Sequence, residues 1–255
     1  MLLAIDIGNS STKFGVFDSS TLIDKFAIHT TSDLAVSDLL FDRLKYVNDR
    51  FFNIDSVVVC SVVPELNETF SKALKELLSV TPVYVDHSFD FGLKIGYHPI
   101  TSLGIDRLVN ASSAVAKYGS PVIVCSFGTA TTVDLVSADK KYLGGVIAPG
   151  MKLLADALHS KTSQLPNVAI EKPKSVIGNT TESSIKSGVF YGYVGLVDGI
   201  LERIFFEAGA RHRVIATGGF ASMIADQGAL VDTVDENLTL DGLRVLIEKT
   251  SNAAM

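Results

Sequence analysis

The sequence predicts an α/β fold built from two similar domains that face each other across a cleft. The chain has 255 residues, 47% hydrophobic and 20% charged, which is a globular composition with enough length for two packed cores. Runs typical of buried strands alternate with runs typical of amphipathic helices. A pattern of strand, glycine turn and second strand opens the chain and recurs near its middle.

The first part of the chain predicts a meander of three strands followed by helices and further strands. Short apolar runs separated by the turns GNSS and DSST indicate strands, while leucines at spacings of three and four residues indicate helices. Continuous apolar runs indicate strands that are covered on both faces. The expected strands are 2–7, 12–17, 22–28, 56–63 and 82–86, and the expected helices are 33–50, 65–79 and 104–117.

The second part begins with the same kind of meander. Its expected strands are 121–127, 129–136, 142–150 and 213–216, and a long helical pattern follows Glu182 with Thr180 as N-cap. Aligning the two halves at one constant shift puts Asp6 on Ser126 and Gly8 on Gly128. We therefore expect one domain over residues 1–115 and a second over residues 116–255.

Charge balance and apolar run lengths exclude several classes of function. Lys and Arg number 22 and Asp and Glu number 28, and the net charge of −6 disfavours nucleic acid or an anionic membrane as partner. No run approaches the ~18 apolar residues of a membrane span, and the apolar run before Asp6 is too short for a signal peptide. We expect a cytoplasmic protein in which Cys60 and Cys125 are reduced core residues.

The turn after the first strand is a candidate phosphate-binding site. Asp6 ends a buried strand, and the turn that follows supplies backbone N–H groups, hydroxyl groups and one cation. Such a turn can hold nucleotide phosphates, and Asp6 can hold a hydrated Mg2+. The alternative is a plain hairpin in which Asp6 accepts local N–H bonds. Neither GxxxxGK[ST] nor GxGxxG is present. The residues of the turn are Gly8, Asn9, Ser10, Ser11, Thr12 and Lys13.

Two later glycine turns are candidates of the same kind. Gly128 and Thr129 occupy the second copy, where they can hold further phosphate oxygens across the cleft or form a simple hairpin. The turn Thr217–Gly219 follows the strand 213–216 and can approach a base or ribose, although glycine pairs after strands are common.

The segment Gly104–Arg107 opens a helix and allows two interpretations. An acid in the first turn, here Asp106, is favoured by the helix dipole alone. In the functional interpretation Asp106 is a general base for a substrate hydroxyl, and Arg107 fixes an anionic group of the substrate. Spacing alone leaves both open.

The long helix after Thr180 carries a strip of glycines, although each one weakens the helix by about 1 kcal/mol. A smooth strip lets another helix approach closely. That helix can come from the same chain or from a second subunit related by two-fold symmetry. The strip consists of Gly188, Gly192, Gly195 and Gly199.

Five motifs occur in an order and at spacings that resemble type III pantothenate kinases: DIGNSSTK, YHPITSLGIDR, FGTATTVD, GGVIAPG and GNTTESSIKSG. The resemblance spans nearly the whole chain. It implies the duplicated ribonuclease-H-like/actin-like ATPase fold of acetate and sugar kinases, heat-shock chaperones and actin. It also implies ATP-dependent phosphorylation of pantothenate to 4'-phosphopantothenate, the first step of coenzyme A biosynthesis.

The same resemblance implies roles for individual residues. The segment from Asp6 to Lys13 resembles the ATP phosphate loop, with Asp6 organising Mg2+ through water, and Thr129 resembles the second phosphate contact. Asp106 resembles the proton acceptor. Thr181 resembles a residue that reaches pantothenate across the interface of a homodimer, which would make the glycine-strip helix a dimerisation helix. The implied pantothenate site is Tyr97, Gly104, Ile105, Asp106 and Arg107.

One position departs from the family pattern. Where the family has an acid in a DxGT sequence that binds K+ or NH4+, this chain has Ser126, which offers an oxygen but no charge. Three interpretations follow: an active kinase with altered cation dependence, a kinase of reduced activity, or a non-catalytic regulatory paralogue that binds pantothenate or nucleotide. A sugar kinase or polyphosphate hydrolase of the same superfamily is a further alternative.

Overall fold

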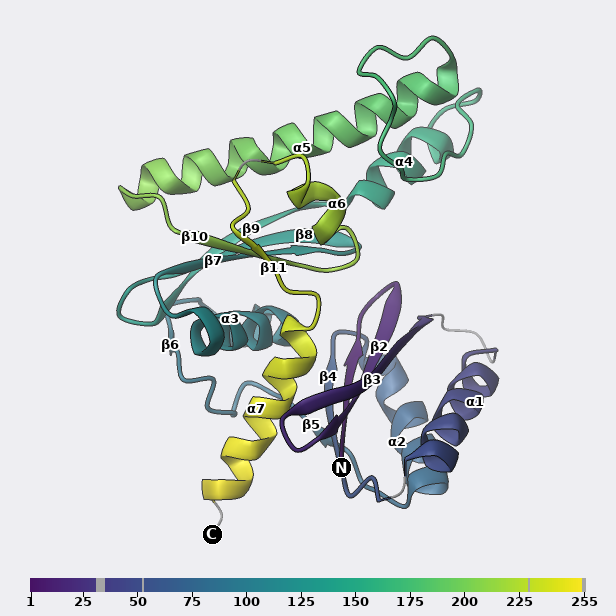
Figure 1. The fold of residues 1–255 in the computed structure, drawn as a ribbon, viewed down its shortest axis with the longest axis vertical. Helices are drawn as coiled ribbons and strands as arrows, with labels where there is room; N and C mark the ends of the chain where they lie inside the picture. The colour runs from purple at the N-terminus through teal and green to yellow at the C-terminus, as the bar shows by residue number, and fades with distance from the viewer. Residues whose placement is uncertain (31–34, 52, 229, 254–255) are drawn as a thin grey trace. The chain divides into compact units, whose positions relative to one another are not determined.

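The computed structural model describes the chain except residues 31–34, 52, 229 and 254–255, and it divides into two compact units (Figure 1). The first unit comprises residues 1–117 and 237–255, and the second comprises residues 118–236. Each unit is a sheet covered by helices, in agreement with the predicted α/β class.

The sheet of the first unit has the strand order β3-β2-β1-β4-β5. The pairs β1–β2 and β2–β3 are antiparallel, whereas β4 is parallel to both β1 and β5. The strands are β1 (Leu2–Ile7), β2 (Ser11–Asp18), β3 (Thr21–His29), β4 (Ser56–Ser61), β5 (Val83–Tyr84) and, outside this sheet, β6 (Lys94–Ile95). The helices are α1 (Ala35–Arg50), α2 (Asn67–Leu78), α3 (Ile105–Tyr118) and α7 (Leu238–Ala253), with 3-10 turns at Pro64–Leu66 and Ile100–Ser102.

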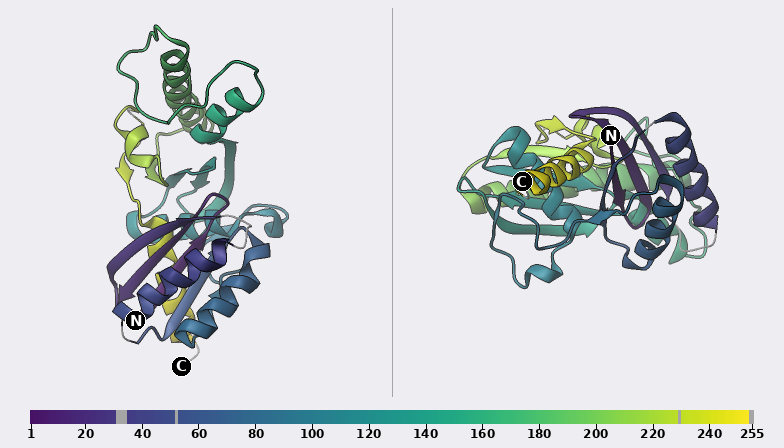
Figure 2. Two further views of the ribbon diagram at one scale, coloured as in Figure 1. Left: turned by 90° about the vertical axis from the view of Figure 1, so that its right-hand side faces the viewer. Right: turned by 90° about the horizontal axis from the view of Figure 1, so that it is seen from below.

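Alternation along β1 decides what each face of this sheet buries. Leu3, Ile5 and Ile7 point to the face covered by α1 and α2, where they are fully buried with Phe14 and Phe70. The two helices run side by side over that face (Figure 2). Asp6 alternates with these residues and therefore belongs to the opposite face. The predicted helix 33–50 begins at residues that lie outside the described part, and its described portion starts at Ala35.

The C-terminal helix α7 corrects the predicted division of the chain. Residues 116–255 were expected to form one domain, but α7 packs on β1, β2 and β4 of the first unit. Its Gly242 lies so close to α3 that a Cβ atom there would be 2.9 Å from Cγ1 of Val109. The Thr239 hydroxyl donates to Oδ1 of Asn110 at 2.7 Å, and Lys117 pairs with Asp241. The chain thus returns to complete its first unit.

The second unit is built around strands in the order β11-β10-β7-β8-β9. Helix α5 runs along one face and buries a stripe that includes Val189, Tyr193 and Val197 (Figure 1). The strands are β7 (Val122–Phe127), β8 (Ala130–Val136), β9 (Lys141–Pro149), β10 (Arg213–Thr217) and β11 (Thr233–Val234). The helices are α4 (Met151–Ser160), α5 (Thr181–Ala208) and α6 (Ala221–Ala225).

The two units repeat one strand plan, as the sequence predicts. In each, an antiparallel meander of three strands is joined by a parallel strand beside its first member, β4 beside β1 and β10 beside β7. The constant shift fails beyond the turn, however. Asp6 pairs with Lys13, whereas its counterpart Ser126 pairs with Thr132, so the second turn is one residue shorter.

Two further expectations concern membranes and cysteines. Among the residues that the structure describes, no helix combines the length and the apolar character needed to cross a bilayer. Cys60 and Cys125 are both free and buried in strands, which confirms the prediction that they belong to the core.

Candidate active site

Asp6 lies in a row of three side chains across the first sheet. It pairs in register with Lys13 of β2 on one side and with Cys60 of β4 on the other. Residues opposite each other on adjacent strands share a face, so the carboxylate lies between an ammonium group and a buried thiol. The row lies at the ends of β1 and β4, beside the turn that joins β1 to β2.

The surroundings of Asp6 favour its protonated form. Burial raises the pKa of Asp6 from 3.8 to about 6, Lys13 offsets part of this rise, and Asp106 adds to it. Burial also raises the pKa of the Cys60 thiol, with further contributions from Asp6 and Asp106. Cys60 is therefore an un-ionised core thiol and not a nucleophile. A cation beside Asp6 would be strongly favoured, because it would stabilise the charge that burial opposes.

The turn after Asp6 is tightly folded and open at its tip. The Gly8 N–H donates to the Ser11 carbonyl at 3.2 Å, and a Cβ atom at Gly8 would lie 3.1 Å from that oxygen. Asn9 and Ser10 are exposed. Thr12, in contrast, is 1% exposed and shares a hydrogen bond of 2.9 Å with Thr30. The structure thus offers Asn9 and Ser10 to a ligand, while the Thr12 side chain supports the hairpin.

Asp106 reaches back over the residue that precedes its helix. A Cβ atom at Gly104 would lie 2.5 Å from Oδ1 of Asp106, too close for any side chain to fit without moving the carboxylate. Helix α3 begins at Ile105, so Asp106 stands in its first turn, where the helix dipole favours negative charge. The charge of Asp106 contributes to the raised pKa of Asp6, after burial and the opposing effect of Lys13.

Arg107 and Tyr97 form a stacked pair beside Asp106. The guanidinium carbon of Arg107 lies 5.8 Å from the centre of the Tyr97 ring, within the range of a cation–π contact. Arg107 is 5% exposed, so its charge is held in place by its surroundings. The first unit therefore brings together Asp6, Asp106 and Arg107, two carboxylates and a fixed cation.

In the second unit, three glycines crowd the end of β7. A Cβ atom at Gly218 would lie 2.5 Å from the Phe127 carbonyl, and one at Gly150 would lie 2.3 Å from the carbonyls of Gly128 and Thr129. Gly218 has a φ of +97°, which side chains rarely adopt. The predicted turns at Gly128 and Gly218 are thus adjacent in space. Gly150 and Gly218 are too close to their neighbours to carry a side chain, whereas a Cβ atom at Gly128 would lie an ordinary 3.6 Å from the Ala130 carbonyl.

Ser126 lies in the second unit's counterpart of the Asp6 row. It pairs with Thr132 of β8 and with Thr217 of β10, so three hydroxyl groups replace the carboxylate, ammonium and thiol. The Thr217 hydroxyl is buried and has no hydrogen-bond partner within the described part of the chain. An orphaned buried hydroxyl is uncommon and indicates room for an unfilled contact.

Thr181 is exposed at the first turn of α5. The helix begins with Thr180 as N-cap in a capping box with Ser183, which confirms the predicted cap. Further along, Cβ atoms at Gly188, Gly192 and Gly195 would meet nothing within 4 Å. The glycine strip therefore has no partner helix among the described residues of its own chain.

Comparison with known proteins decides the family. A sequence model described as type III pantothenate kinase matches residues 2–203. A type III pantothenate kinase of Desulfosudis oleivorans is 45% identical over 96% of this chain and 98% of its own length. That of Halalkalibacterium halodurans is 39% identical over 98% and 99%. The chain belongs to the type III pantothenate kinase family.

Solved structures extend the likeness of this pantothenate kinase to more distant proteins. A polyphosphate/ATP-glucomannokinase of Arthrobacter superposes with a TM-score of 0.52 at 15% identity, covering 98% of both chains. The ethanolamine utilization protein EutJ of Carboxydothermus hydrogenoformans gives 0.58 at 11% identity, covering 96% of this chain and 89% of that protein. Such low identities carry the fold alone, and that fold confirms the predicted actin-like and sugar-kinase class.

Sequence reasoning missed one residue that the structure brings into the site of this kinase, Gly150, and it missed the pairing of Thr217, which it had named only in a turn able to approach a base or ribose. Gly150 packs on Gly128 and Thr129, and its only sequence signal is the APG ending of the strand before α4. Thr217 shares the row of Ser126 because β10 is the parallel neighbour of β7, and no local pattern reveals that pairing. Among the described residues, no three His, Cys, Asp or Glu side chains gather into a metal site.

Proposed function

We propose that this chain transfers a phosphoryl group from ATP to the hydroxyl of pantothenate, giving 4'-phosphopantothenate, the first step of coenzyme A biosynthesis. The observation that carries the proposal is the match of nearly the whole chain to type III pantothenate kinases, in a chain that has a buried Asp6 and an Asp106 that influences its pKa. Phosphoryl transfer depends on positioning and charge neutralisation. One carboxylate beside the metal and one beside the attacking hydroxyl suit that chemistry.

Asp6 and the turn Gly8–Lys13 are the proposed site for the phosphates of ATP. Mg2+ is commonly bound through one or two carboxylates, several waters and the substrate phosphates, so a single buried carboxylate fits it. The metal supplies neutralisation of phosphate charge. Binding it would also oppose the raised pKa of Asp6, since the ion stabilises the ionised carboxylate. Exposed Asn9 and Ser10 and the ammonium of Lys13 complete the phosphate contacts.

Asp106 and Arg107 are the proposed means of handling pantothenate. Asp106 accepts the proton of the substrate hydroxyl as it attacks, and Gly104 leaves the space in which its carboxylate lies. Arg107, stacked on Tyr97, holds the carboxylate of pantothenate. Ile105 contributes its backbone at the start of the helix. A cation fixed before the substrate arrives loses little freedom on binding.

The second unit supplies the remaining contacts in this proposal. Thr129 offers a hydroxyl and an N–H to the phosphates beside Gly128. Thr181 reaches the pantothenate of a second subunit, which makes the enzyme a homodimer with its sites at the interface. The open glycine strip along α5 supports this arrangement because a partner helix can approach it closely. A cytoplasmic location fits the use of ATP and the free cysteines.

The monovalent cation is the point on which this chain differs from its family. Ser126, Thr132 and the orphaned hydroxyl of Thr217 are neutral oxygens that can coordinate K+ or NH4+, but the row has no carboxylate. We therefore propose an active kinase with weakened or altered dependence on the cation.

The test is formation of 4'-phosphopantothenate from ATP and pantothenate at fixed Mg2+, with Na+, K+ or NH4+ varied. Turnover in at least one salt is the expected result, with weaker stimulation by K+ than in a relative that has the acid. A folded protein that binds pantothenate yet forms no product in any salt would instead be a non-catalytic paralogue. Hydrolysis of ATP or polyphosphate without pantothenate would point to another kinase or hydrolase of the superfamily.

A further inference from the structure

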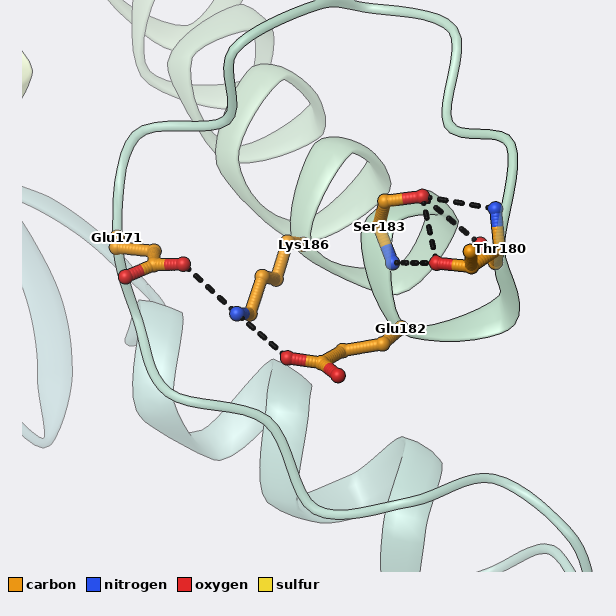
Figure 3. Close-up of polar contacts among 5 residues, drawn as sticks. All are labelled: Glu171, Thr180, Glu182, Ser183 and Lys186. Carbon is orange, nitrogen blue, oxygen red and sulfur yellow. Dashed lines mark hydrogen bonds and ion pairs between the residues drawn. The ribbon is translucent and has the colours of Figure 1, made fainter.

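The segment of residues 171–180, here called the strap, is fastened along the first two turns of α5 (Figure 3). Lys186 of α5 pairs with Glu171 at the far end of the strap and with Glu182 of its own helix. At the near end, the Ser183 N–H donates to Oγ1 of Thr180, and the Thr180 N–H donates to Oγ of Ser183. Both ends of the strap are thus held by one short piece of helix.

Two more contacts hold the middle of the strap. The Ser187 hydroxyl donates to the carbonyl of Val176. A Cβ atom at Gly178 would lie 2.4 Å from the Ser184 nitrogen, so the strap backbone lies directly on the helix. Thr181 follows the strap immediately as the first residue of α5. The position of Thr181 therefore depends on how the strap lies on the first turns of the helix.

Lys186 is the buried centre of the charged cluster. Its side chain is 17% exposed, whereas those of Glu171 and Glu182 are each 59% exposed. The ammonium nitrogen lies 2.7 Å from Oε1 of Glu171 and 2.6 Å from Oε1 of Glu182. Because both oxygens touch the same nitrogen, removing Lys186 would leave the two carboxylates facing each other without their shared cation, and only the weaker influence of Lys174 on Glu171 would remain.

We propose that Lys186 is a positioning residue for pantothenate: it holds the strap on α5 and neutralises the two glutamates beside Thr181. The inference rests on the proposed function, in which Thr181 approaches pantothenate. Pantothenate is an anion, so uncompensated carboxylates near Thr181 would repel it as well as displace the strap. Ordinary exposed ion pairs contribute little to stability. The pairs of Lys186, however, control both the position of the strap and the charge near Thr181.

The charge arrangement predicts a specific pattern of variants. Lys186→Met should raise the KM for pantothenate about tenfold, with kcat within twofold and the KM for ATP unchanged. Lys186→Arg should restore the wild-type KM, because it keeps the cation. Adding Glu171→Gln to Lys186→Met should recover about threefold of the loss, because it removes half of the repulsion. The KM defect should shrink as salt is raised, and should be smaller for a neutral amide of pantothenate.

The matched control is Lys72→Met, which removes an i,i+4 pair with Glu68 from α2, far from the strap in sequence. This variant should leave all constants unchanged. Digestion with trypsin reports the strap itself, since Lys174 is an exposed cleavage site within it, whereas the bond after Lys172 precedes Pro173 and resists trypsin. Lys186→Met should be cut there faster than wild type and Lys72→Met should not.

Three outcomes would overturn the inference. One is a folded Lys186→Met enzyme with wild-type KM for pantothenate. Another is an equal loss for ATP and pantothenate, which would indicate general loosening. The third is a failure of Lys186→Arg to rescue. A wild-type protein without turnover would refute the proposed function instead. In that case, calorimetry of pantothenate binding still tests the inference about Lys186. Equal affinity of wild type and Lys186→Met for pantothenate would refute it.

Discussion

Replacing Asp6 with asparagine should make the folded protein more stable at neutral pH and remove the carboxylate that we propose holds Mg2+. Burial raises the pKa of Asp6 from 3.8 to about 6, against the attraction of Lys13 and with the help of Asp106. Ionising Asp6 is therefore about 3 kcal/mol less favourable in the folded chain than in the unfolded chain. Asparagine is close in shape and carries no charge, so it avoids this penalty, which already includes the attraction of Lys13.

The sign of the pH dependence follows from linkage. Between about pH 4 and pH 6 the folded state keeps a proton on Asp6 that the unfolded state has released. This group therefore destabilises the fold progressively as pH rises, with its full effect reached above about pH 7. The Asp6→Asn variant should exceed wild type by about 3 kcal/mol at pH 8, and the difference should fall below about 1 kcal/mol near pH 4.

Urea unfolding at pH 8 and near pH 4 measures the difference, with equal m-values as the check that both proteins unfold to the same extent. Asp106→Asn provides the matched background. It removes a charge that raises the pKa of Asp6, so the gain from Asp6→Asn should be smaller there. If Asp6→Asn is less stable than wild type at pH 8, the favourable contacts of the ionised carboxylate outweigh the cost of its burial. That result would refute the reasoning.

Three further predictions concern catalysis and assembly. Asp106→Asn should lower kcat by about 10²-fold, measured by product formation, without lowering the melting temperature; near-normal turnover would exclude it as the proton acceptor. Gly104→Ala places a methyl group 2.5 Å from Oδ1 of Asp106, so kcat should fall about tenfold while ATP binding is kept; an unaltered kcat would show that the carboxylate moves without consequence. Gly192→Leu fills the open strip of α5 and should turn a dimer into monomers in sedimentation; a monomeric wild type would remove the basis for this prediction.

The sequence predicts those parts of the fold that local pattern determines. The meander strands and the helix α5 follow from apolar periodicity and from Thr180 as N-cap. Helices α4 and α7 are not among the predicted elements, and both carry weak sequence signals: the N-cap Gly150 makes no side-chain cap, and Gly242 lowers the helix propensity of α7 from within. The membership of α7 in the first unit depends on tertiary packing, which no local pattern encodes.

In the candidate site, too, local sequence predicts some features and tertiary packing decides the others. Asp6 and Asp106 are predictable because an acid at a strand end and an acid at a helix start are local features. The effect of Asp106 on the pKa of Asp6 is not, because it depends on how α3 lies against the first sheet. The burial of Thr12 is likewise invisible in a run of small polar residues, where every hydroxyl looks equally available. Which of these hydroxyl groups faces solvent depends on the path of the backbone through the turn.

The repeat shows most clearly why shared backbone does not mean shared chemistry. Both hairpins place a residue at the end of a central strand between an antiparallel and a parallel neighbour. In the first unit that residue is Asp6, whose charge is opposed by burial and so favours a divalent cation beside it. In the second it is Ser126, among hydroxyls that can supply weak neutral contacts. Charge recognition therefore rests on the first copy, and the second copy of this kinase is left to contribute hydrogen bonds and close backbone approach.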